Sequence, residues 1–260
     1  MDVMLLGTGS ADGWPSPFCA CRSCRWALVA GEIRGQTAAL IDDTLLIDCG
    51  PEAPRAALRG GRTLAAVRHI LLTHGHFDHV GDDLADLVEL AGRAGATVVC
   101  SHEMSVQLGS MGVEAVGMNA GGTFEAAGIG FTMVTAVHTG GATLTQGDTQ
   151  VTRELGCWGW IIEFEDGTTV YHSGDTDVFG DMQLIGERFN PEVAVLPIGG
   201  HYTMGPRDAG RAADMVGAAT VIPVHYATFP ALAGTPDQLR DHTGATVVEL
   251  EPGETYEHQP

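Results

Sequence analysis

The sequence contains no lysine, so its cations are 13 arginines set against 33 aspartates and glutamates in 260 residues. The formal net charge is −20 at pH 7 with histidine counted as neutral. Broad binding to phosphate backbones requires a surface on which Lys and Arg outnumber the acids. We therefore expect no broad nucleic-acid binding and a small molecule as substrate, and the composition is compatible with a homo-oligomer.

Long apolar runs are also absent. No stretch approaches the ~18 apolar residues that cross a bilayer, and residues 1–4 offer no basic segment ahead of the first apolar run. We therefore expect a cytoplasmic protein that does not bind membranes. With 44% hydrophobic and 18% charged residues the chain can bury a large core. No linker or low-complexity segment divides it, which predicts a single domain over residues 1–260.

Cysteine is sparse, and six residues are too few for a disulfide scaffold in a chain of this size. Three of them, Cys19, Cys21 and Cys24, fall within six residues. A disulfide there would close a very small loop, whereas three thiolates can converge on one metal ion without backbone strain. Three free thiols are the alternative. The other cysteines are interpreted as isolated small apolar residues.

Short apolar segments rich in β-branched residues predict strands at 3–6, 38–41, 45–47, 69–72, 97–100, 131–137, 160–164, 168–171, 193–198, 220–224 and 246–250. Helical periodicity predicts helices at 82–92, 104–108, 181–187, 206–216 and 236–241. Paired strands come first, and strands that alternate with helices follow. This order predicts an α/β fold with mixed sheets whose outer faces are covered by helices.

The most informative stretch is 69–81, HILLTHGHFDHVG, where an apolar strand opens directly into four side chains that can bind metals. His74, His76, Asp78 and His79 lie within six residues, and Gly75 leaves the first two histidines free to turn toward one ion. Asp78 and His79 can reach a second ion nearby. A solvated histidine-rich turn is the alternative interpretation.

Three further side chains follow other predicted strands: His138, Asp175 and His225. Taken alone, either histidine would be interpreted as a packed or hydrogen-bonded residue. Because functional groups collect where strands emerge into loops, their shared position with His74 favours one common metal site.

These motifs resemble the metallo-β-lactamase superfamily, whose ordered pattern is HxHxDH followed by a later His, Asp and His. The resemblance implies a four-layer αββα sandwich of two mixed sheets with a two-metal site along one edge. It also implies that His74, His76 and His138 hold one metal, that Asp78, His79 and His225 hold the other, and that Asp175 bridges them.

From about residue 68 to 250 the sequence is similar to the uncharacterised metal-dependent hydrolases related to the ascorbate-phosphate lactonases. The motifs that carry this similarity are MNAGGTF, YHSGDTDVFGDM, LPIGGHYTMGP and VIPVHYATFP. The first fifty residues differ, because GTGS followed by CACRSC resembles the phosphoribosyl cyclic phosphodiesterases and their transfer-RNA-processing relatives. That second resemblance implies a structural zinc at Cys19, Cys21 and Cys24. Its fourth ligand is not assigned: His242 is a candidate because its role is otherwise unexplained, and an ordinary surface histidine is the alternative.

The expected activity is that of a metal-dependent hydrolase in which a hydroxide bridging two divalent ions cleaves a small ester, lactone or cyclic phosphodiester. Zinc is the expected metal, with Mn and Fe as alternatives. Asp78, and His201 at a further strand end, are the candidate catalytic residues. His201 either protonates a leaving group, binds a substrate anion or orients a ligand. The long segment 139–157 is either a lid over the site or a disordered surface loop.

Three other functions stay open at this point. An iron-dependent redox enzyme on the same fold would use the same ligand types. A transfer-RNA-processing phosphodiesterase fits the GTGS and HxHxDH motifs, although the net charge of −20 disfavours a large polyanionic substrate. A noncatalytic binding module would be expected to have lost some of the seven ligands.

Overall fold

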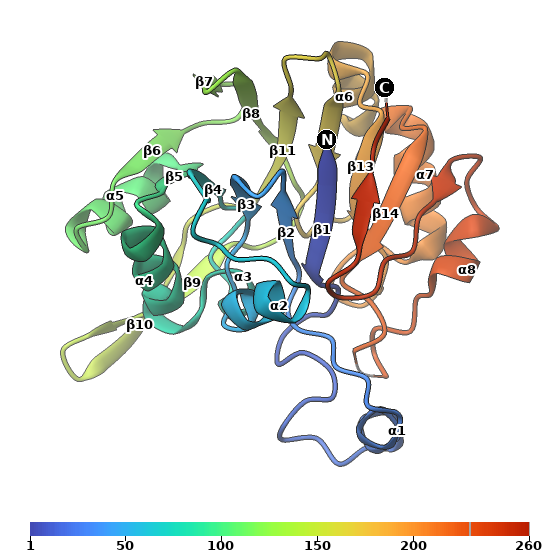
Figure 1. The fold of residues 1–260 in the computed structure, drawn as a ribbon, viewed down its shortest axis with the longest axis horizontal. Helices are drawn as coiled ribbons and strands as arrows, with labels where there is room; N and C mark the ends of the chain where they lie inside the picture. Colours follow the sequence, from blue (N-terminus) through green and yellow to red (C-terminus); the bar gives the residue numbers. More distant parts are fainter. Residues whose placement is uncertain (229, 260) are drawn as a thin grey trace.

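Two seven-stranded sheets form the centre of the computed structural model, which describes residues 1–228 and 230–259 (Figure 1). From edge to edge, the first sheet consists of β16 (Thr255–Glu257), β1 (Asp2–Gly7), β2 (Ala38–Ile41), β3 (Leu45–Ile47), β4 (His69–Leu71), β5 (Thr97–Ser101) and β6 (Ala115–Met118). The second consists of β15 (Thr246–Val247), β14 (Thr220–Val224), β13 (Val193–Pro197), β12 (Thr169–His172), β11 (Trp158–Glu163), β8 (Ile129–Thr135) and β7 (Thr123–Ala126). Each sheet contains parallel and antiparallel pairs, as predicted.

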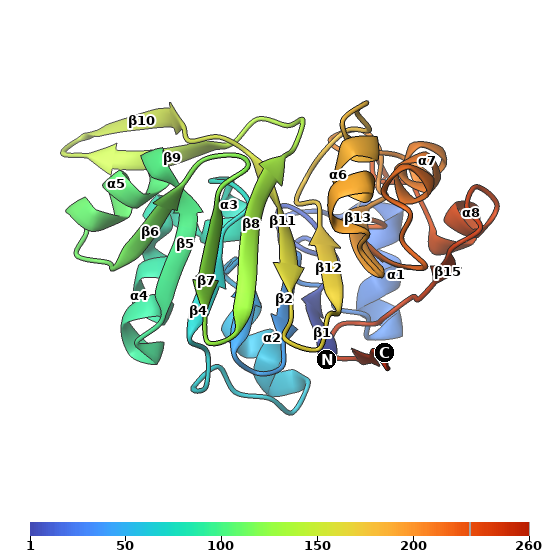
Figure 2. The same ribbon diagram turned by 90° about the horizontal axis from the view of Figure 1, so that it is seen from above.

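In chain order the helices are α1 (Arg22–Ala30), α2 (Ala53–Arg59), α3 (Phe77–Val80), α4 (Ala85–Ala94), α5 (His102–Ser110), α6 (Met182–Phe189), α7 (Pro206–Val216) and α8 (Pro236–Arg240). Helices α2 and α4 to α8 cover the outer faces of the two sheets, whereas α1 stands apart from both sheets (Figure 1). Figure 2 shows α4 and α5 on the side of the first sheet and α6, α7 and α8 on the side of the second. The order helix, sheet, sheet, helix confirms the predicted four-layer α/β fold.

Alternation along the strands explains the layers. On β1, Val3 and Leu5 point into the core between the sheets, whereas Met4 and Leu6 point into the core beneath α2 and α4. Because successive side chains of a strand face opposite sides, a strand that is apolar at every position is buried on both faces. No helix in the described parts of the chain is long and apolar enough to span a membrane.

Trp160 connects the two sheets. Its side chain is fully buried on β11, and its indole N–H donates a hydrogen bond of 3.0 Å to the carbonyl oxygen of Leu72, just beyond β4. We expect Trp160→Phe to lower the free energy of unfolding by about 1–3 kcal/mol, because it leaves a small cavity and an unpaired buried carbonyl. Urea denaturation measures this change. Trp26→Phe, at a side chain 58% exposed, is the matched control and should change stability by less than about 1 kcal/mol.

Several elements differ from the prediction. The helix expected from residue 82 begins instead with a 3₁₀ turn (Asp82–Leu84), and α4 starts only at Ala85, because Asp83 and Leu84 have positive φ angles of 51° and 59°. The strand expected at 246–250 shortens to β15. Helices α1, α2 and α3 were not predicted, since their short apolar patterns are interrupted by cysteine, proline or histidine.

Neither interpretation of segment 139–157 as a lid or a disordered loop describes what the structure shows. It forms a hairpin of β9 (Gly141–Gln146) and β10 (Thr149–Glu154) that projects beyond the first sheet (Figure 2). The amide and the hydroxyl of Thr145 both donate hydrogen bonds to the carboxylate of Asp83 and fix the hairpin to the 3₁₀ turn. Only its base approaches the predicted metal site, where Thr139 Oγ1 lies 3.4 Å from His76 Nε2.

Candidate metal centre

The histidine-rich motif occupies the loop after β4 and the short helix α3. His74 and His76 precede the helix, and Asp78 and His79 lie within it. Steric crowding explains why position 75 is a glycine. A Cβ at this position would lie 2.9 Å from the Ala142 Cβ and 3.0 Å from the Gly140 oxygen, at the base of the hairpin. The glycine therefore lets the hairpin pack directly against the loop.

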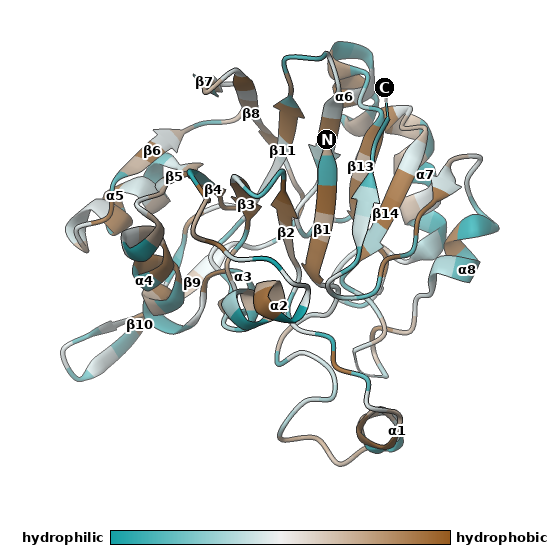
Figure 3. Ribbon diagram, in the orientation of Figure 1, coloured by the Kyte–Doolittle hydropathy of each residue, from teal (hydrophilic) through white to brown (hydrophobic). Residues whose placement is uncertain are grey.

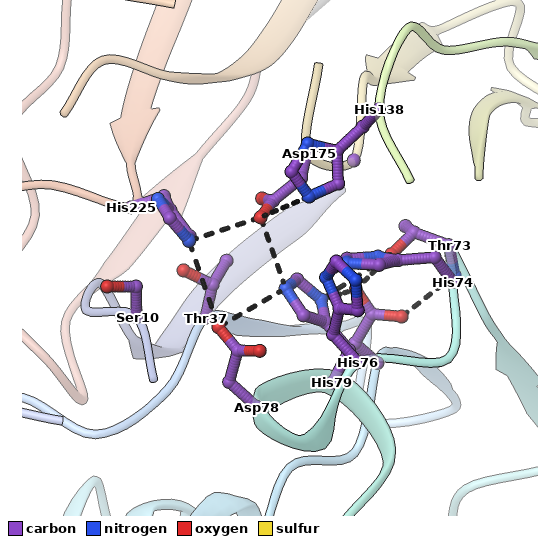
Figure 4. A network of polar contacts seen from close by, with 12 residues as sticks. Ser10, Thr37, Thr73, His74, His76, Asp78, His79, His138, Asp175 and His225 are labelled. Atoms are coloured by element: carbon purple, nitrogen blue, oxygen red, sulfur yellow. Dashed lines mark hydrogen bonds and ion pairs between the residues drawn. The ribbon is translucent and has the colours of Figure 1, made fainter. Parts of the chain in front are cut away.

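The second sheet supplies the other three side chains. His138 follows β8, Asp175 follows β12 and His225 follows β14. The two sheets present these strand ends to the same edge of the sandwich, and Figure 4 shows the seven side chains pointing toward one another.

Among the described residues, three groups of three side chains in this centre are close enough to share an ion, and one of them, His74, His79 and Asp175, includes members of the other two. The donor atoms of His74, His76 and His138 lie within 4.8 Å of one another, and the same holds for those of Asp78, His79 and His225. These are the two predicted sets.

Asp175 lies between the two groups. Its Oδ2 is 3.1 Å from His225 Nε2, 3.6 Å from His79 Nε2 and 3.9 Å from His138 Nε2. A carboxylate in this position lies close to members of both groups, which is where the resemblance to the metallo-β-lactamase superfamily implies a bridging ligand.

A further carboxylate, that of Asp48, contacts residues of the centre, and the sequence analysis did not predict it. Asp48 is fully buried, and its oxygens accept hydrogen bonds from the Thr73 amide and hydroxyl, both at 2.8 Å. Its Oδ2 also lies 2.7 Å from His79 Nδ1. Asp48 directly follows β3, so the rule that found the other residues, a polar side chain at a strand end, could have found it.

Burial lowers the pKa values of the histidines in the centre, whereas neighbouring carboxylates raise them. Burial lowers the pKa of His74 well below its usual value and also lowers the pKa values of His76 and His138. Burial also opposes protonation of His225, but the Asp175 and Asp78 carboxylates outweigh it and raise its pKa to about 9. Around His79, burial is likewise outweighed by the Asp48 carboxylate and its neighbours, and the pKa is raised.

The donor set fits divalent cations. His79 Nε2 is buried and has no hydrogen-bond partner among the described residues, although it points between two carboxylates. Desolvation also opposes ionisation of Asp78 and Asp175, yet the histidines around them hold the pKa values of both carboxyls below the usual range. Buried carboxylates and neutral imidazoles together suit zinc, manganese or iron.

A cavity of about 320 Å³ opens onto the centre. Five of the seven predicted ligands line it, all except His74 and His79. The other lining residues are Ser10, Ala11, Thr139 and Tyr202. His201 is exposed and is not among these residues, but its ring lies against the ring of Tyr202, with centroids 4.4 Å apart. The structure thus brings Tyr202, and not His201, to the cavity wall.

The three clustered cysteines meet at a second place, beside α1. The sulfur atoms of Cys19, Cys21 and Cys24 lie within 4.8 Å of one another. Hydrogen bonds from the Cys24 amide and from Cys19 lower the pKa of Cys21 to about 7, whereas burial raises the pKa of Cys24 to about 11. His242 is not part of this group; its backbone packs against Gly210 of α7.

The chain is similar to known metal-dependent hydrolases in both sequence and structure. Residues 43–226 match the family model described as Beta-lactamase superfamily domain. A UPF0173 metal-dependent hydrolase of Chloroflexus aurantiacus is 45% identical over 213 residues, which cover 79% of this chain and 83% of the relative. The solved structure of Igni18, a metallo hydrolase from Ignicoccus hospitalis, has a TM-score of 0.70 and 29% identity, with both chains fully covered. Zn²⁺-bound PqqB from Methylobacterium extorquens has a TM-score of 0.71 at 18% identity, covering 99% and 100% of the two chains, and shows the fold alone.

Proposed function

Because the chain belongs to the UPF0173 metal-dependent hydrolases of the β-lactamase superfamily, we propose that it binds two zinc ions at this centre and hydrolyses a small ester, lactone or cyclic phosphodiester. The main support is the convergence of seven side chains from four separated segments, five of which line one cavity. Two divalent ions held there supply an activated water and a Lewis acid for attack on a carbonyl or phosphorus atom.

The protein residues have separate roles in this proposal. His74, His76 and His138 would hold one ion, Asp78, His79 and His225 would hold the other, and Asp175 would bind both. Asp48 accepts a hydrogen bond from His79 Nδ1, so that Nε2 is free to coordinate. The hydroxyls of Ser10, Thr139 and Tyr202 line the cavity and are placed to contact substrate. We assign His201 a supporting role through its ring contact with Tyr202.

A panel of chromogenic phosphodiester, lactone, ester, thioester and β-lactam substrates, tested after reconstitution with Zn, Mn or Fe, decides the reaction class. Turnover of an ester, lactone or cyclic phosphodiester with zinc is the expected result. Elemental analysis of protein purified without added metal tests the redox alternative, since bound iron together with oxygen consumption would contradict hydrolysis. Absence of turnover with every metal would favour a binding module.

Metal binding should release protons. The raised pKa values of His79 and His225 mean that both are protonated at neutral pH when no metal is bound, and an ion must displace those protons. In the metal-free protein their charged forms stabilise the fold below about pH 6.5, and this contribution is lost as pH rises through the raised pKa. Apparent metal affinity therefore rises with pH up to about 9, the pKa of His225.

Calorimetric titration of the metal-free protein with zinc at pH 7, in two buffers of different ionisation enthalpy, counts the released protons. We expect at least about one proton per protein, and fewer for His225→Ala. Equal heats in both buffers would show that the histidines are already neutral.

We also propose a structural zinc at Cys19, Cys21 and Cys24. Three converging sulfurs, one of them buried and one with a lowered pKa, favour a thiolate site. Cys24→Ser should lower the zinc content by about one ion per chain while hydrolysis persists. Cys100→Ser, at a buried cysteine outside the group, is the control for the loss of a thiol as such. An unchanged metal count in Cys24→Ser would identify three free thiols.

A further inference from the structure

Thr73 directly precedes the histidine-rich motif, and its side chain is fully buried. The strands β3 and β4 are parallel neighbours, so Asp48 after β3 and Thr73 after β4 leave the first sheet at the same edge. The strands around them are apolar, and Figure 3 shows β2 and β3 mostly in the brown of hydrophobic residues. A polar side chain buried in such surroundings needs hydrogen-bond partners, and those partners indicate its role.

The Thr73 hydroxyl connects the Asp48 carboxylate to His74 (Figure 4). Its Oγ1 donates a hydrogen bond of 2.8 Å to Asp48 Oδ2. Because a hydroxyl has a single proton, Oγ1 accepts the proton of His74 Nδ1, which lies 3.0 Å away. His74 therefore carries its proton on Nδ1 and keeps the lone pair of Nε2 free. That Nε2 lies 2.8 Å from His76 Nδ1, within the group formed by His74, His76 and His138.

The same carboxylate also contacts a histidine of the other group. Asp48 Oδ2 lies 2.7 Å from His79 Nδ1, whereas Thr73 Oγ1 is 3.5 Å from that nitrogen, so the ring proton of His79 is directed to the carboxylate. The opposite ring nitrogen, His79 Nε2, faces Asp78 and Asp175 at 3.7 and 3.6 Å. Asp48 thus contacts one histidine of each group, His79 directly and His74 through a hydroxyl.

Backbone and methyl contacts hold this hydroxyl in place. The Thr73 amide donates a hydrogen bond of 2.8 Å to Asp48 Oδ1, and the Thr73 carbonyl oxygen accepts one of 2.9 Å from the Trp158 amide. On the other side lies Gly174, where a Cβ would come within 2.9 Å of the Thr73 Cβ and 3.1 Å of its Cγ2. The methyl group of Thr73 therefore packs closely against Gly174, and a β-branched side chain fixed in this way keeps its hydroxyl directed toward Asp48.

We propose that Thr73 is a positioning residue of the metal centre, whose hydroxyl lets the Asp48 carboxylate orient the His74 ring as well as the His79 ring. One buried carboxylate then sets the ring orientation and the proton position of one ligand in each ion site. This inference rests on the two-zinc hydrolase proposed above. Rings that are oriented before an ion arrives lose less freedom on binding, so the contact raises metal affinity.

Zinc titration of the metal-free protein against a chromophoric chelator tests the proposal without relying on activity. Thr73→Val fills the same space but leaves the His74 Nδ1 proton without an acceptor, so the affinity for at least one of the two ions should fall about 10–100-fold. Thr73→Ser keeps the hydroxyl and should restore the wild-type affinity. Circular dichroism confirms that each variant is folded.

Thr132→Val is the matched control. It removes a buried threonine hydroxyl in the middle of β8, where Thr132 Oγ1 lies 2.7 Å from Thr123 Oγ1. This variant loses a buried hydrogen bond just as Thr73→Val does, but it should leave both zinc affinities unchanged.

Nuclear magnetic resonance of the zinc-loaded protein with ¹⁵N-labelled histidine reports the proton position on each ring. In the wild type, His74 should carry a proton on Nδ1 that is protected from exchange with water. In Thr73→Val that proton should exchange about tenfold faster, as expected for the loss of one hydrogen bond. A threonine with a purely structural role would leave this exchange rate unchanged. Because the proton position is measured in the wild type itself, the proposal stays testable even if Thr73→Val does not fold.

Three results would overturn the proposal: wild-type zinc affinity in Thr73→Val, an equal loss of affinity in Thr73→Ser, or a wild-type His74 ring that carries its proton on Nε2. The proposed hydrolysis is tested separately. A wild-type protein that hydrolyses substrate while Thr73→Val binds zinc normally would refute only the role of Thr73. A wild-type protein that shows the Thr73 effect on zinc binding but no turnover would refute only the hydrolysis.

Discussion

Replacing either His74 or Asp78 with alanine is expected to lower kcat/KM by at least about 10³-fold, because in the proposed two-metal site each substitution removes one ligand of a different ion. The fold should survive. His74 lies in a loop, and the Asp78 carboxylate accepts one hydrogen bond of 2.9 Å from the Ala11 amide. Removing that acceptor costs about 1–3 kcal/mol.

Steady-state kinetics on the best substrate of the panel, with metal content measured on the same samples, checks this expectation. His102→Ala and Asp177→Ala replace an exposed histidine and an exposed aspartate and should retain full activity. If both ligand variants kept wild-type activity, His74 and Asp78 would have no part in the reaction.

Asp48→Ala should produce the largest loss of stability among substitutions around the site. The Asp48 side chain is fully buried, and removing it leaves the Thr73 amide, the Thr73 hydroxyl and His79 Nδ1 without their acceptor. We expect the metal-free protein to lose about 3–5 kcal/mol of unfolding free energy. Metal affinity should also fall about 10–100-fold, because His79 loses the partner that orients its ring.

Chemical denaturation of metal-free protein and zinc titration separate these two effects. Asp48→Asn keeps an acceptor for Thr73 but cannot neutralise His79, so it should lose less stability than Asp48→Ala while still binding metal more weakly. Equal stability of wild type and Asp48→Ala would mean that water replaces the carboxylate.

The predicted helices and strands that the structure confirms are those that a local sequence pattern identifies. Strands such as β13 and β14 are apolar at nearly every position and short, so their burial on both faces can be recognised from the sequence. The hairpin in segment 139–157 was not predicted, because its two strands have polar side chains at most positions and therefore the composition of a loop. At the kink of Asp83 and Leu84, the Asp83 carboxylate accepts a hydrogen bond from Thr145, which lies 62 residues away in the chain. A contact between such distant residues cannot be recognised from a local sequence pattern.

Within the site, the sequence alone predicted the seven side chains that the structure brings together, because the clustering of imidazoles and carboxylates at strand ends is a property of residue type and spacing. Only the tertiary structure decided how they are arranged: that Asp175 lies between the two groups, that Asp48 supports His79, and that Tyr202 and not His201 reaches the cavity. The physical reason is that these relations depend on how two sheets pack against each other. Packing sets distances between residues that lie far apart in the chain, and distance, not residue type, determines which charges and ligands act together.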